Sequence, residues 1–311
     1  MIRFFRDVRG DPCIPGGSVI CLGSFDGVHL GHQALIQQTV QRARALKLTP
    51  TTICFEPLPR EFFGRNPFQA RVGVLRDRIR LFRLAGIEVV CLLHFTERLS
   101  FVSAEKFVTD LLVRRLQARE VWIGPGFRFG HRRCGDLSLL QELGAQWRFN
   151  AQAIRPVQQD GQLISSTRIR QLLAKGQLKE ASRLLGYQYC ISGHVVRGRQ
   201  LGRTLGYPTA NLRLKSVPAL TGVYAAWVHG LADSPMPAVV NVGYRPTVAG
   251  QEPLVEAHVF DYHSDFYGRL IRVDFVDKLR DEQKFNNLEQ LRRQLHHDAL
   301  KARSVLKTVS S

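Results

Sequence analysis

Hydrophobic and polar positions follow two alternating periods in the first half of the chain. Short apolar, β-branched runs, which are typical of buried strands, occupy residues 19–22, 51–55, 88–94 and 120–123. Between these runs, apolar residues recur at helical spacing over residues 33–46, 75–84 and 104–116. Apolar strands that alternate with helices predict a parallel sheet covered on both faces. In such sheets, ligands bind in the crevice at the carboxyl ends of the strands.

The pattern changes from about Ile164 onwards to two short helices and then to closely spaced strands. The predicted helices cover residues 165–173 and 178–185, and Gly176 and Gly186 follow their ends. The predicted strands cover residues 189–196, 222–228, 237–242, 254–260 and 270–275. Strands at this spacing favour a compact antiparallel β-barrel.

The chain ends in one more predicted helix, for which Asn286 or Asn287 is the cap. The side chains predicted to face inward from it are Leu288, Leu291 and Leu295. We place the domain boundary near Leu185, which gives one domain of residues 1–185 and a second of residues 186–311.

Composition indicates a soluble globular protein. The 311 residues suffice for two domains that each bury a core. No apolar run approaches the ~20 residues that span a bilayer, and the N-terminus lacks the apolar segment of a secretory signal. The six cysteines are widely spaced without a Cys-x-x-Cys pair, which indicates buried, reduced thiols. We therefore expect a cytoplasmic protein that contacts no membrane.

The net charge of +18 is the one unusual bulk property. Arginine, which forms bidentate contacts with phosphate, supplies most of it, so anionic ligands are one interpretation. A generally basic surface is the other, because the arginines are spread along the chain. A nucleic-acid-binding protein usually clusters Lys and Arg on one element, and no cluster is evident. We expect no nucleic-acid partner, but salt-dependent binding to duplex DNA without ATP turnover would favour that alternative.

A first candidate site follows the first apolar run and reads Gly23-Ser-Phe-Asp-Gly-Val-His-Leu-Gly-His32. Its glycines permit a tight turn, and a helix that starts near Leu30 or Gly31 offers free N–H groups to an anion. His29 and His32 both reach that point and can hydrogen-bond phosphate. The candidate phosphate-binding residues of this motif are Gly23, Ser24, Phe25, Asp26 and Gly31. Zinc is disfavoured because no third or fourth ligand lies nearby.

A second candidate site lies two-thirds along the chain and reads Gly202-Arg-Thr-Leu-Gly-Tyr-Pro-Thr-Ala-Asn-Leu212. Thr209 and Asn211 offer hard oxygen ligands, which suit Mg²⁺ when other positions stay open to water and phosphate. The candidate phosphate-binding residues are Gly202, Arg203 and Thr204. Considered alone, this segment would be a glycine-rich hairpin loop.

Ten positions of the first motif resemble the histidine motif of the nucleotidyltransferase superfamily, which implies a Rossmann-like parallel sheet. Members of that superfamily attack the α-phosphorus of a nucleoside triphosphate and release pyrophosphate. Residues 164–170 resemble the superfamily's second motif, which holds the β- and γ-phosphates at a helix start. The resemblance implies phosphate binding by Ser165, Ser166 and Thr167, and a catalytic role for His29, His32 and Arg168. Alone, the second motif would be an ordinary capped helix.

Three further segments, residues 55–62, 124–130 and 133–136, resemble the flavin-side segments of the bacterial FMN adenylyltransferase (FAD synthetase) module. The flavin-binding residues implied by this resemblance are Pro57, Pro59, Phe62, Phe127 and Phe129. Two positions depart from the family: Leu58 stands where a histidine is common, and Gly126 where Asp or Asn is expected. The second departure puts one contact to the flavin or nucleotide in doubt.

The second candidate site resembles the nucleotide and magnesium loop of riboflavin kinase, and several segments between residues 222 and 285 agree. The resemblance implies an antiparallel barrel of the riboflavin kinase type, in which Thr209 and Asn211 position Mg²⁺ and ATP. It also implies that Glu256 is the general base that accepts the proton of the ribityl 5′-hydroxyl. Without the resemblance, Glu256 would be read as a strand residue that faces solvent.

The two modules occur in the order of the bacterial bifunctional riboflavin kinase/FMN adenylyltransferase family. The resemblance implies a flavin cofactor biosynthesis enzyme that phosphorylates riboflavin to FMN with ATP and then adenylates FMN to FAD. Its expected partners are small molecules, namely ATP, riboflavin and FMN, and we expect a monomer or a weak homo-oligomer. One alternative stays open: a single half is active and the other binds flavin without turnover.

Overall fold

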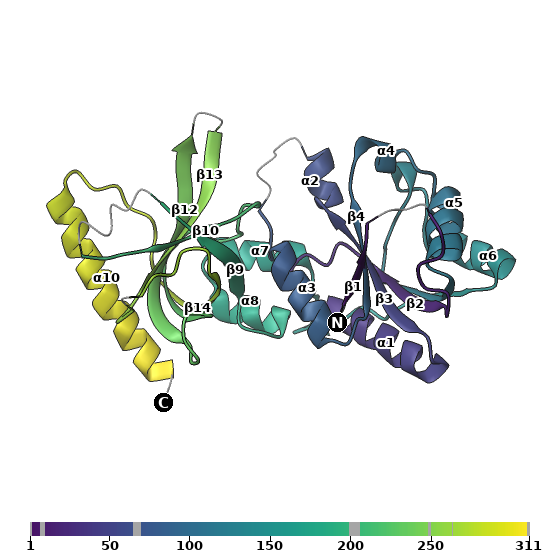
Figure 1. Ribbon diagram of the computed structural model, residues 1–311, viewed down its shortest axis with the longest axis horizontal. Coiled ribbons are helices and arrows are strands. Elements are labelled where there is room, and N and C mark those ends of the chain that lie inside the picture. The colour runs from purple at the N-terminus through teal and green to yellow at the C-terminus, as the bar shows by residue number, and fades with distance from the viewer. Residues whose placement is uncertain are drawn as a thin grey trace. The chain divides into compact units, whose positions relative to one another are not determined.

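The computed structural model describes residues 2–6, 10–64, 70–198, 206–247, 250–262 and 264–309. The chain forms two compact units (Figure 1), each of which is described by itself. The first unit comprises Met1–Gln69 and Arg78–Ser165, and the second comprises Ala70–Asp77 and Ser166–Ser311. This division follows backbone packing, so the functional domains 1–185 and 186–311 stay a prediction.

The first unit contains a six-stranded sheet in which all neighbouring strands are parallel, as predicted. Its strands are β1 (Arg3–Phe5), β2 (Ser18–Leu22), β3 (Thr49–Glu56), β4 (Val89–His94), β5 (Ala118–Ile123) and β6 (Asn150–Ala153). Their order is β1-β4-β3-β2-β5-β6, so the chain reverses its direction of travel across the sheet between β2 and β5. Such a switch point opens a crevice at the carboxyl edge of a parallel sheet.

Helices connect the strands of this sheet. They are α1 (Leu30–Leu46), α2 (Pro59–Phe63), α3 (Leu75–Leu84), α4 (Glu97–Ser100), α5 (Ala104–Lys106), the π-helical η1 (Phe107–Arg115), the 3₁₀-helical η2 (His131–Arg133) and α6 (Leu137–Trp147). A small hairpin of β7 (Gln158–Gln159) and β8 (Gln162–Leu163) follows. The boundary between the two units falls inside α3, after Asp77.

The core of the first unit lies on both faces of the sheet, because its central strands are buried throughout. Ile20 and Leu22 of β2 belong to one hydrophobic cluster with Leu111 of η1 and Leu140 of α6. Cys21 points to the opposite face, where its thiol bonds to Thr39 of α1 and burial raises its pKa to about 11. Alternate residues of a strand point to opposite faces, so η1 and α6 cover one face and α1 covers the other.

The second unit is built around a closed, six-stranded antiparallel barrel, again as predicted. The barrel strands are β9 (Cys190–Val196), β10 (Ala210–Arg213), β11 (Gly222–His229), β12 (Met236–Thr247), β13 (Gly250–Val259) and β14 (Leu270–Arg280), in the order β10-β13-β12-β11-β14-β9. The helices of this unit are α7 (Ser166–Ala174), α8 (Leu178–Leu185) and α10 (Leu288–Val309).

Helix α10 packs against the outer surface of the barrel (Figure 1). Its contact is made by Ala302 and Leu306, which join a hydrophobic cluster with barrel residues such as Val223. Asn287 caps the helix, because its Oδ1 accepts the Gln290 N–H at 2.8 Å. Leu288 was predicted to face inward, and this is wrong: it is 57% exposed, because the first turn lies outside the buried stripe. Among the described residues, no helix is both long and apolar enough to span a membrane.

Candidate active sites

The first predicted motif connects β2 to α1, and α1 begins at Leu30 as expected. His29 is the N-cap residue, and its Nδ1 accepts the His32 main-chain N–H at 3.4 Å. The two imidazole rings stack with their centroids 3.7 Å apart. A Cβ on Gly31 would lie only 3.2 Å from the His29 ring, so glycine at this position lets the ring approach the helix start.

The turn before this helix has an unusual backbone. Phe25 and Val28 have φ angles of 51° and 39°, which are uncommon for residues with a side chain. The Phe25 ring is fully buried and contacts both His32 and Phe82, each at a centroid separation of 5.2 Å. Packing of the Phe25 ring therefore stabilises the turn. Because the ring is buried, only the main chain of Phe25 can contact a ligand.

Burial determines the charge of the two histidines. It lowers the pKa of His29 to about 4. It also lowers the pKa of His32 well below its ordinary value, and the nearby His29 and Arg78 act in the same direction. Both rings are therefore neutral at physiological pH, and each offers one N–H donor. Nδ1 of His32 is buried and has no hydrogen-bond partner among the described atoms, so it is available to a ligand.

Two arginines connect this motif to the segment that follows β3. Arg60 of α2 binds the buried carboxylate of Asp26 at 2.9 Å. Arg78 of α3 donates to the main-chain oxygens of Ser24 and Phe55 and to the carboxylate of Glu56. The sequence analysis assigned a role to neither arginine. A signal was present for Arg78, because it occupies the apolar stripe of its helix, four residues before the buried Phe82.

The predicted flavin residues follow the carboxyl ends of β3 and β5, the strands on either side of β2. The Glu56–Pro57 peptide bond is cis, and α2 begins two residues later at Pro59. Phe62 is 40% exposed and its ring contacts that of Phe95 at 5.3 Å. These segments and the histidine motif thus share one edge of the sheet.

The predicted aromatic pair after β5 divides into one buried and one half-buried ring. Phe129 is 6% exposed and packs on Phe107 of the core. Phe127 is half-buried and stacks on Phe129 at 6.3 Å.

Of the two departures from the family pattern, Leu58 is buried at the start of α2 and Gly126 is exposed with a φ of 68°.

The other phosphate motif forms the start of α7, which begins at Ser166. Within this turn, Arg170 donates to the Thr167 hydroxyl at 3.3 Å. Ser165 closes the first unit, whereas Ser166, Thr167 and Arg168 belong to the second. Phosphate binding by these residues stays a prediction.

The second candidate site is a row of polar residues on adjacent barrel strands. Glu256 on β13 is the register partner of Asn211 on β10 and of Asn241 on β12. Residues directly opposite in antiparallel strands project from the same face. Glu256 is half-buried between the buried Val255 and Ala257, and Asn241 likewise lies between two buried valines, so the row points out of the barrel. The sequence analysis noted the segment that contains Asn241 but assigned that residue no role.

Asn211 provides the strongest sign that this row binds a ligand. It is only 6% exposed, yet its Oδ1 is buried without a hydrogen-bond partner among the described atoms. A Cβ on Gly198 would lie 2.7 Å from this Oδ1, so the side chain of Asn211 leaves no room for any residue but glycine at position 198. Thr209 is half-buried beside it, and its main-chain oxygen is 3.5 Å from Nδ2 of Asn211. The other predicted residues, Gly202, Arg203 and Thr204, lie outside the described residues.

Comparison of the chain with known proteins shows the family to which it belongs. A family model described as FAD synthetase matches residues 12–168, and one described as riboflavin kinase matches residues 185–306. The bifunctional riboflavin kinase/FMN adenylyltransferase of Escherichia coli strain K12 is 42% identical over 92% of this chain and 92% of its own. The protein of that name from Haemophilus influenzae is 38% identical over 97% and 99%. The chain belongs to this bifunctional family.

A solved structure supports the fold of the family throughout the chain. The crystal structure described as a macrolide-efflux protein from Streptococcus pneumoniae covers 97% of this chain and 98% of its own, with a TM-score of 0.78 and 30% identity. The efflux description belongs to that protein. For the present chain, the two family models and the curated relatives agree on enzymes of flavin metabolism.

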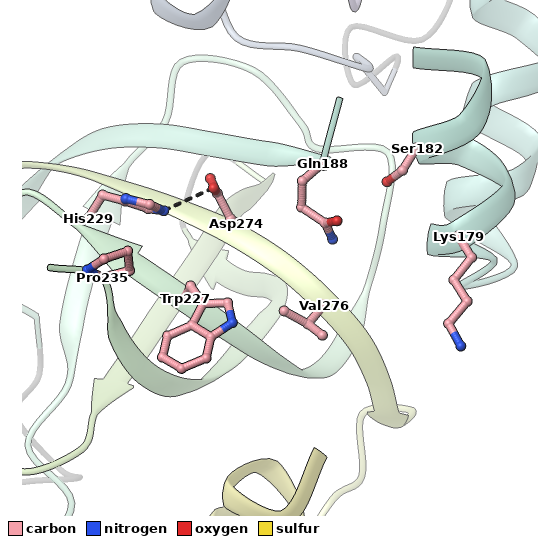
Figure 2. A pocket seen from close by; sticks show the side chains of 8 residues that line it. All are labelled: Lys179, Ser182, Gln188, Trp227, His229, Pro235, Asp274 and Val276. Atoms are coloured by element: carbon pink, nitrogen blue, oxygen red, sulfur yellow. Dashed lines mark hydrogen bonds and ion pairs between the residues drawn. The ribbon is translucent and has the colours of Figure 1, made fainter. Parts of the chain in front are cut away.

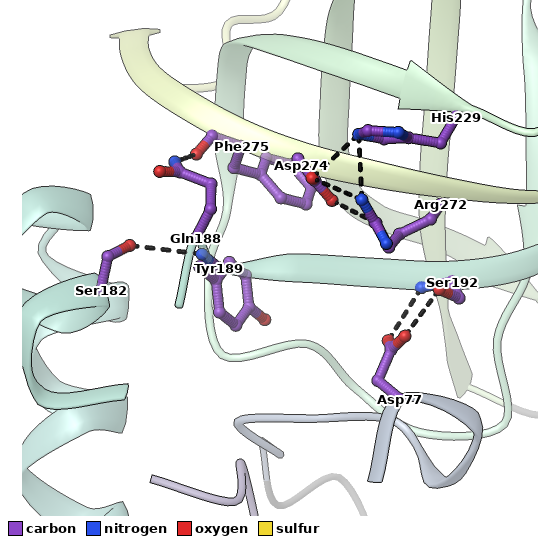
Figure 3. A network of polar contacts seen from close by, with 9 residues as sticks. All are labelled: Asp77, Ser182, Gln188, Tyr189, Ser192, His229, Arg272, Asp274 and Phe275. Atoms are coloured by element: carbon purple, nitrogen blue, oxygen red, sulfur yellow. Dashed lines mark hydrogen bonds and ion pairs between the residues drawn. The ribbon is translucent and has the colours of Figure 1, made fainter. Parts of the chain in front are cut away.

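The barrel also has a cavity that none of the family motifs lines. It measures about 590 Å³ and lies between α8 and the strands β11 and β14 (Figure 2). Its walls are Lys179, Ser182, Gln188, Trp227, His229, Pro235, Asp274 and Val276. Four of the polar side chains have protein partners (Figure 3): Asp274 binds His229 as well as Arg272, Gln188 donates to the Phe275 oxygen, and Ser182 accepts the Tyr189 N–H. The cavity therefore resembles a structural gap more than a built binding site.

Proposed function

We propose that this chain phosphorylates riboflavin to FMN in the barrel and adenylates FMN to FAD in the α/β half, with ATP as the second substrate of both reactions. The observation that carries the proposal is the presence of two separate polar sites, one on each fold. His29 and His32 meet at a helix start in one, and the row of Asn211, Glu256 and Asn241 lies on the other.

In the kinase reaction, Glu256 accepts the proton of the ribityl 5′-hydroxyl, and the hydroxyl oxygen attacks the γ-phosphorus of ATP. The γ-phosphoryl group leaves ADP and forms the phosphate ester of FMN. Glu256 suits this role because it is half-buried beside Asn211, within the row that faces out of the barrel. Such reactions depend mainly on positioning and charge stabilisation, so the surrounding amides are as important as the base.

Magnesium fits the donor set of this row. The buried Oδ1 of Asn211, which has no hydrogen-bond partner among the described residues, and the hydroxyl of Thr209 are oxygen ligands of the kind that Mg²⁺ prefers. When bound with ATP, the ion neutralises part of the triphosphate charge. Asn211 would hold it, and its own orientation is fixed by the close approach of Gly198. Gly202, Arg203 and Thr204 would hold the phosphates, in keeping with the family.

In the adenylation, a phosphate oxygen of FMN attacks the α-phosphorus of ATP, the bond to the β-phosphate breaks and pyrophosphate leaves. No protein nucleophile is required. His29 and His32 donate hydrogen bonds from neutral rings to the phosphates. Within the first unit, the main chain from Gly23 to Asp26, Gly31 and Ser165 contribute to triphosphate binding. The family resemblance assigns phosphate contacts to Ser166, Thr167 and Arg168 as well. Pro57, Pro59, Phe62, Phe127 and Phe129 accommodate the flavin.

Nucleotide products distinguish the two reactions. Riboflavin, ATP and Mg²⁺ are incubated with the chain, and FMN, FAD, ADP and pyrophosphate are quantified over time. The proposal predicts one ADP for each flavin phosphorylated and one pyrophosphate for each FAD formed. FMN and ADP without FAD or pyrophosphate would mean that only the barrel is active. Absence of all four products would refute both assignments.

A further inference from the structure

Arg78 is buried more completely than any other arginine that contacts the first site. Its side chain is 1% exposed, in the middle of α3. One guanidinium nitrogen donates to the Ser24 oxygen at 2.9 Å and to the Phe55 oxygen at 3.3 Å. The other donates to Phe55 at 3.3 Å and to the Glu56 carboxylate. The planar fork of arginine is suited to such simultaneous contacts, whereas the single ammonium of lysine is not.

These contacts join two segments that are distant in sequence. Ser24 belongs to the histidine motif after β2, and Phe55 and Glu56 end β3 and begin the flavin-side segment of residues 55–62. Arg78 therefore acts with the Arg60–Asp26 pair to fix the separation between the triphosphate side and the flavin side of the site. An apolar residue on the same helical stripe would fill the space without the desolvation cost of a buried charge. The desolvation cost of burying Arg78 is offset by the hydrogen bonds that its guanidinium makes to both segments at once.

The charge of Arg78 also acts on the catalytic motif. Arg78 is one of the groups that lower the pKa of His32, after burial and His29. The Arg78 guanidinium thus binds both segments and also lowers the pKa of His32.

We propose that Arg78 is a positioning residue of the adenylyl transfer, because it holds the histidine motif and the flavin segment at the separation that in-line attack requires. This inference rests on the proposed function of the first site. Arg78 itself contacts main-chain oxygens and Glu56, so it acts through the segments that it aligns.

The test compares Arg78→Met and Arg78→Lys in FAD formation from FMN and ATP. Each substrate keeps the contacts of its own segment, so KM should change less than about threefold, whereas kcat falls about 100-fold in Arg78→Met because misalignment affects the reacting atoms. Arg78→Lys retains the charge but loses the fork, and its kcat should lie between wild type and Arg78→Met. Riboflavin phosphorylation by the same molecules should stay unchanged and serves as an internal control.

Arg42→Met is the matched control. Arg42 pairs with Glu120 in the same unit and has hydrogen bonds to neither segment, so its loss should leave kcat for FAD formation unchanged. An NMR titration measures the pKa of His32, which a purely structural role of Arg78 would leave unchanged. The pKa of His32 should rise in Arg78→Met and stay nearer the wild-type value in Arg78→Lys.

Three outcomes would overturn the inference: a kcat for Arg78→Met within about threefold of wild type, a raised KM with unchanged kcat, or an equal loss in Arg42→Met. If Arg78→Met fails to fold, Arg78→Lys decides alone, and a wild-type kcat for it rejects the proposal. His32→Ala separates the two claims. Full FAD formation by His32→Ala would reject the site itself, whereas an inactive His32→Ala beside a normal Arg78→Met would reject only the role of Arg78.

Discussion

His29 and His32 illustrate how burial changes what a histidine contributes to an anion site. Exposed imidazoles at a helix start would gain charge near a phosphate, but desolvation lowers the pKa of both rings here. The sequence predicted their positions and their shared side of the helix. It did not reveal their neutrality, because that depends on Phe25 and on the neighbouring Arg78, which only the fold brings close.

The lowered pKa of His29 predicts an acid-sensitive first unit. Its pKa falls from 6.5 to about 4 on folding. Between these two values, the unfolded chain binds a proton at His29 and the folded chain does not. The free energy of unfolding is therefore highest above pH 6.5 and decreases as the pH falls to about 4. Between about pH 7 and about pH 4, wild type should lose about 3 kcal/mol more unfolding free energy than His29→Asn.

His29→Asn is the suitable comparison because asparagine still accepts a hydrogen bond at an N-cap. Urea unfolding of both proteins at the two pH values gives the difference directly. An identical loss in the two proteins would show that His29 does not titrate as its burial requires.

Glu256 carries the second residue-scale prediction. Glu256→Gln keeps the shape and the strand register but cannot accept a proton, so kcat for FMN formation should fall about 10²- to 10⁴-fold. FAD formation from supplied FMN should not change. Glu289→Gln, an exposed glutamate on α10, is the control and should behave as wild type. A kinase rate that survives Glu256→Gln would assign the base to another group.

At the scale of elements, the apolar central strands were predictable, whereas polar or very short segments were not, and the apolar helix α6 was also missed. The central strands β2 to β5 were predicted because both of their faces are buried. β6, with the polar sequence Asn150–Ala153, was missed because an edge strand pairs with only one neighbour and need not be apolar. β10 was missed because it lies within the glycine-rich motif itself, although it carries Asn211.

The same limit applies to the sites. Motif residues could be assigned from their spacing, and Thr209, Asn211 and Glu256 were named in this way. Asn241 joined them only through strand register, which no local pattern specifies. Arg78 was similarly invisible as a link between segments, because its partners Ser24 and Glu56 are far away in sequence.

The docking of α10 on the barrel predicts a contrast between two ion pairs. Asp298 is 2% exposed and accepts hydrogen bonds from Arg280 of β14 at 2.7 and 3.0 Å. Asp298→Ala leaves the Arg280 guanidinium, which is 17% exposed, without its carboxylate partner and should lower the unfolding free energy of the barrel half by about 3 kcal/mol. Asp261→Asn neutralises the exposed partner of Arg303 with a residue that tolerates the φ of 57° at this position, and it should cost less than about 1 kcal/mol.

Chemical denaturation of the two variants measures this contrast, with FAD formation from supplied FMN reporting whether the first unit is intact. Equal destabilisation by Asp298→Ala and Asp261→Asn would mean that the Arg280–Asp298 pair does not hold α10 in place.

At the scale of the whole molecule, two folds carry two chemistries in one chain. Each fold was predictable, because alternating strand and helix signals are typical of a parallel sheet and regularly spaced strands are typical of a barrel. The domain limits of residues 1–185 and 186–311, a monomeric or weakly oligomeric state and a cytoplasmic location stay predictions. The central claim is that the two sites work independently.

Product analysis of two single-site variants tests that claim most directly. Wild type, His32→Ala and Asn211→Ala are each supplied with ATP, Mg²⁺ and either riboflavin or FMN, and the flavins are separated by chromatography. We predict that His32→Ala accumulates FMN from riboflavin, and that Asn211→Ala forms FAD only from FMN. Loss of both activities in either soluble, folded variant, or FAD formation from riboflavin by both, would contradict the account.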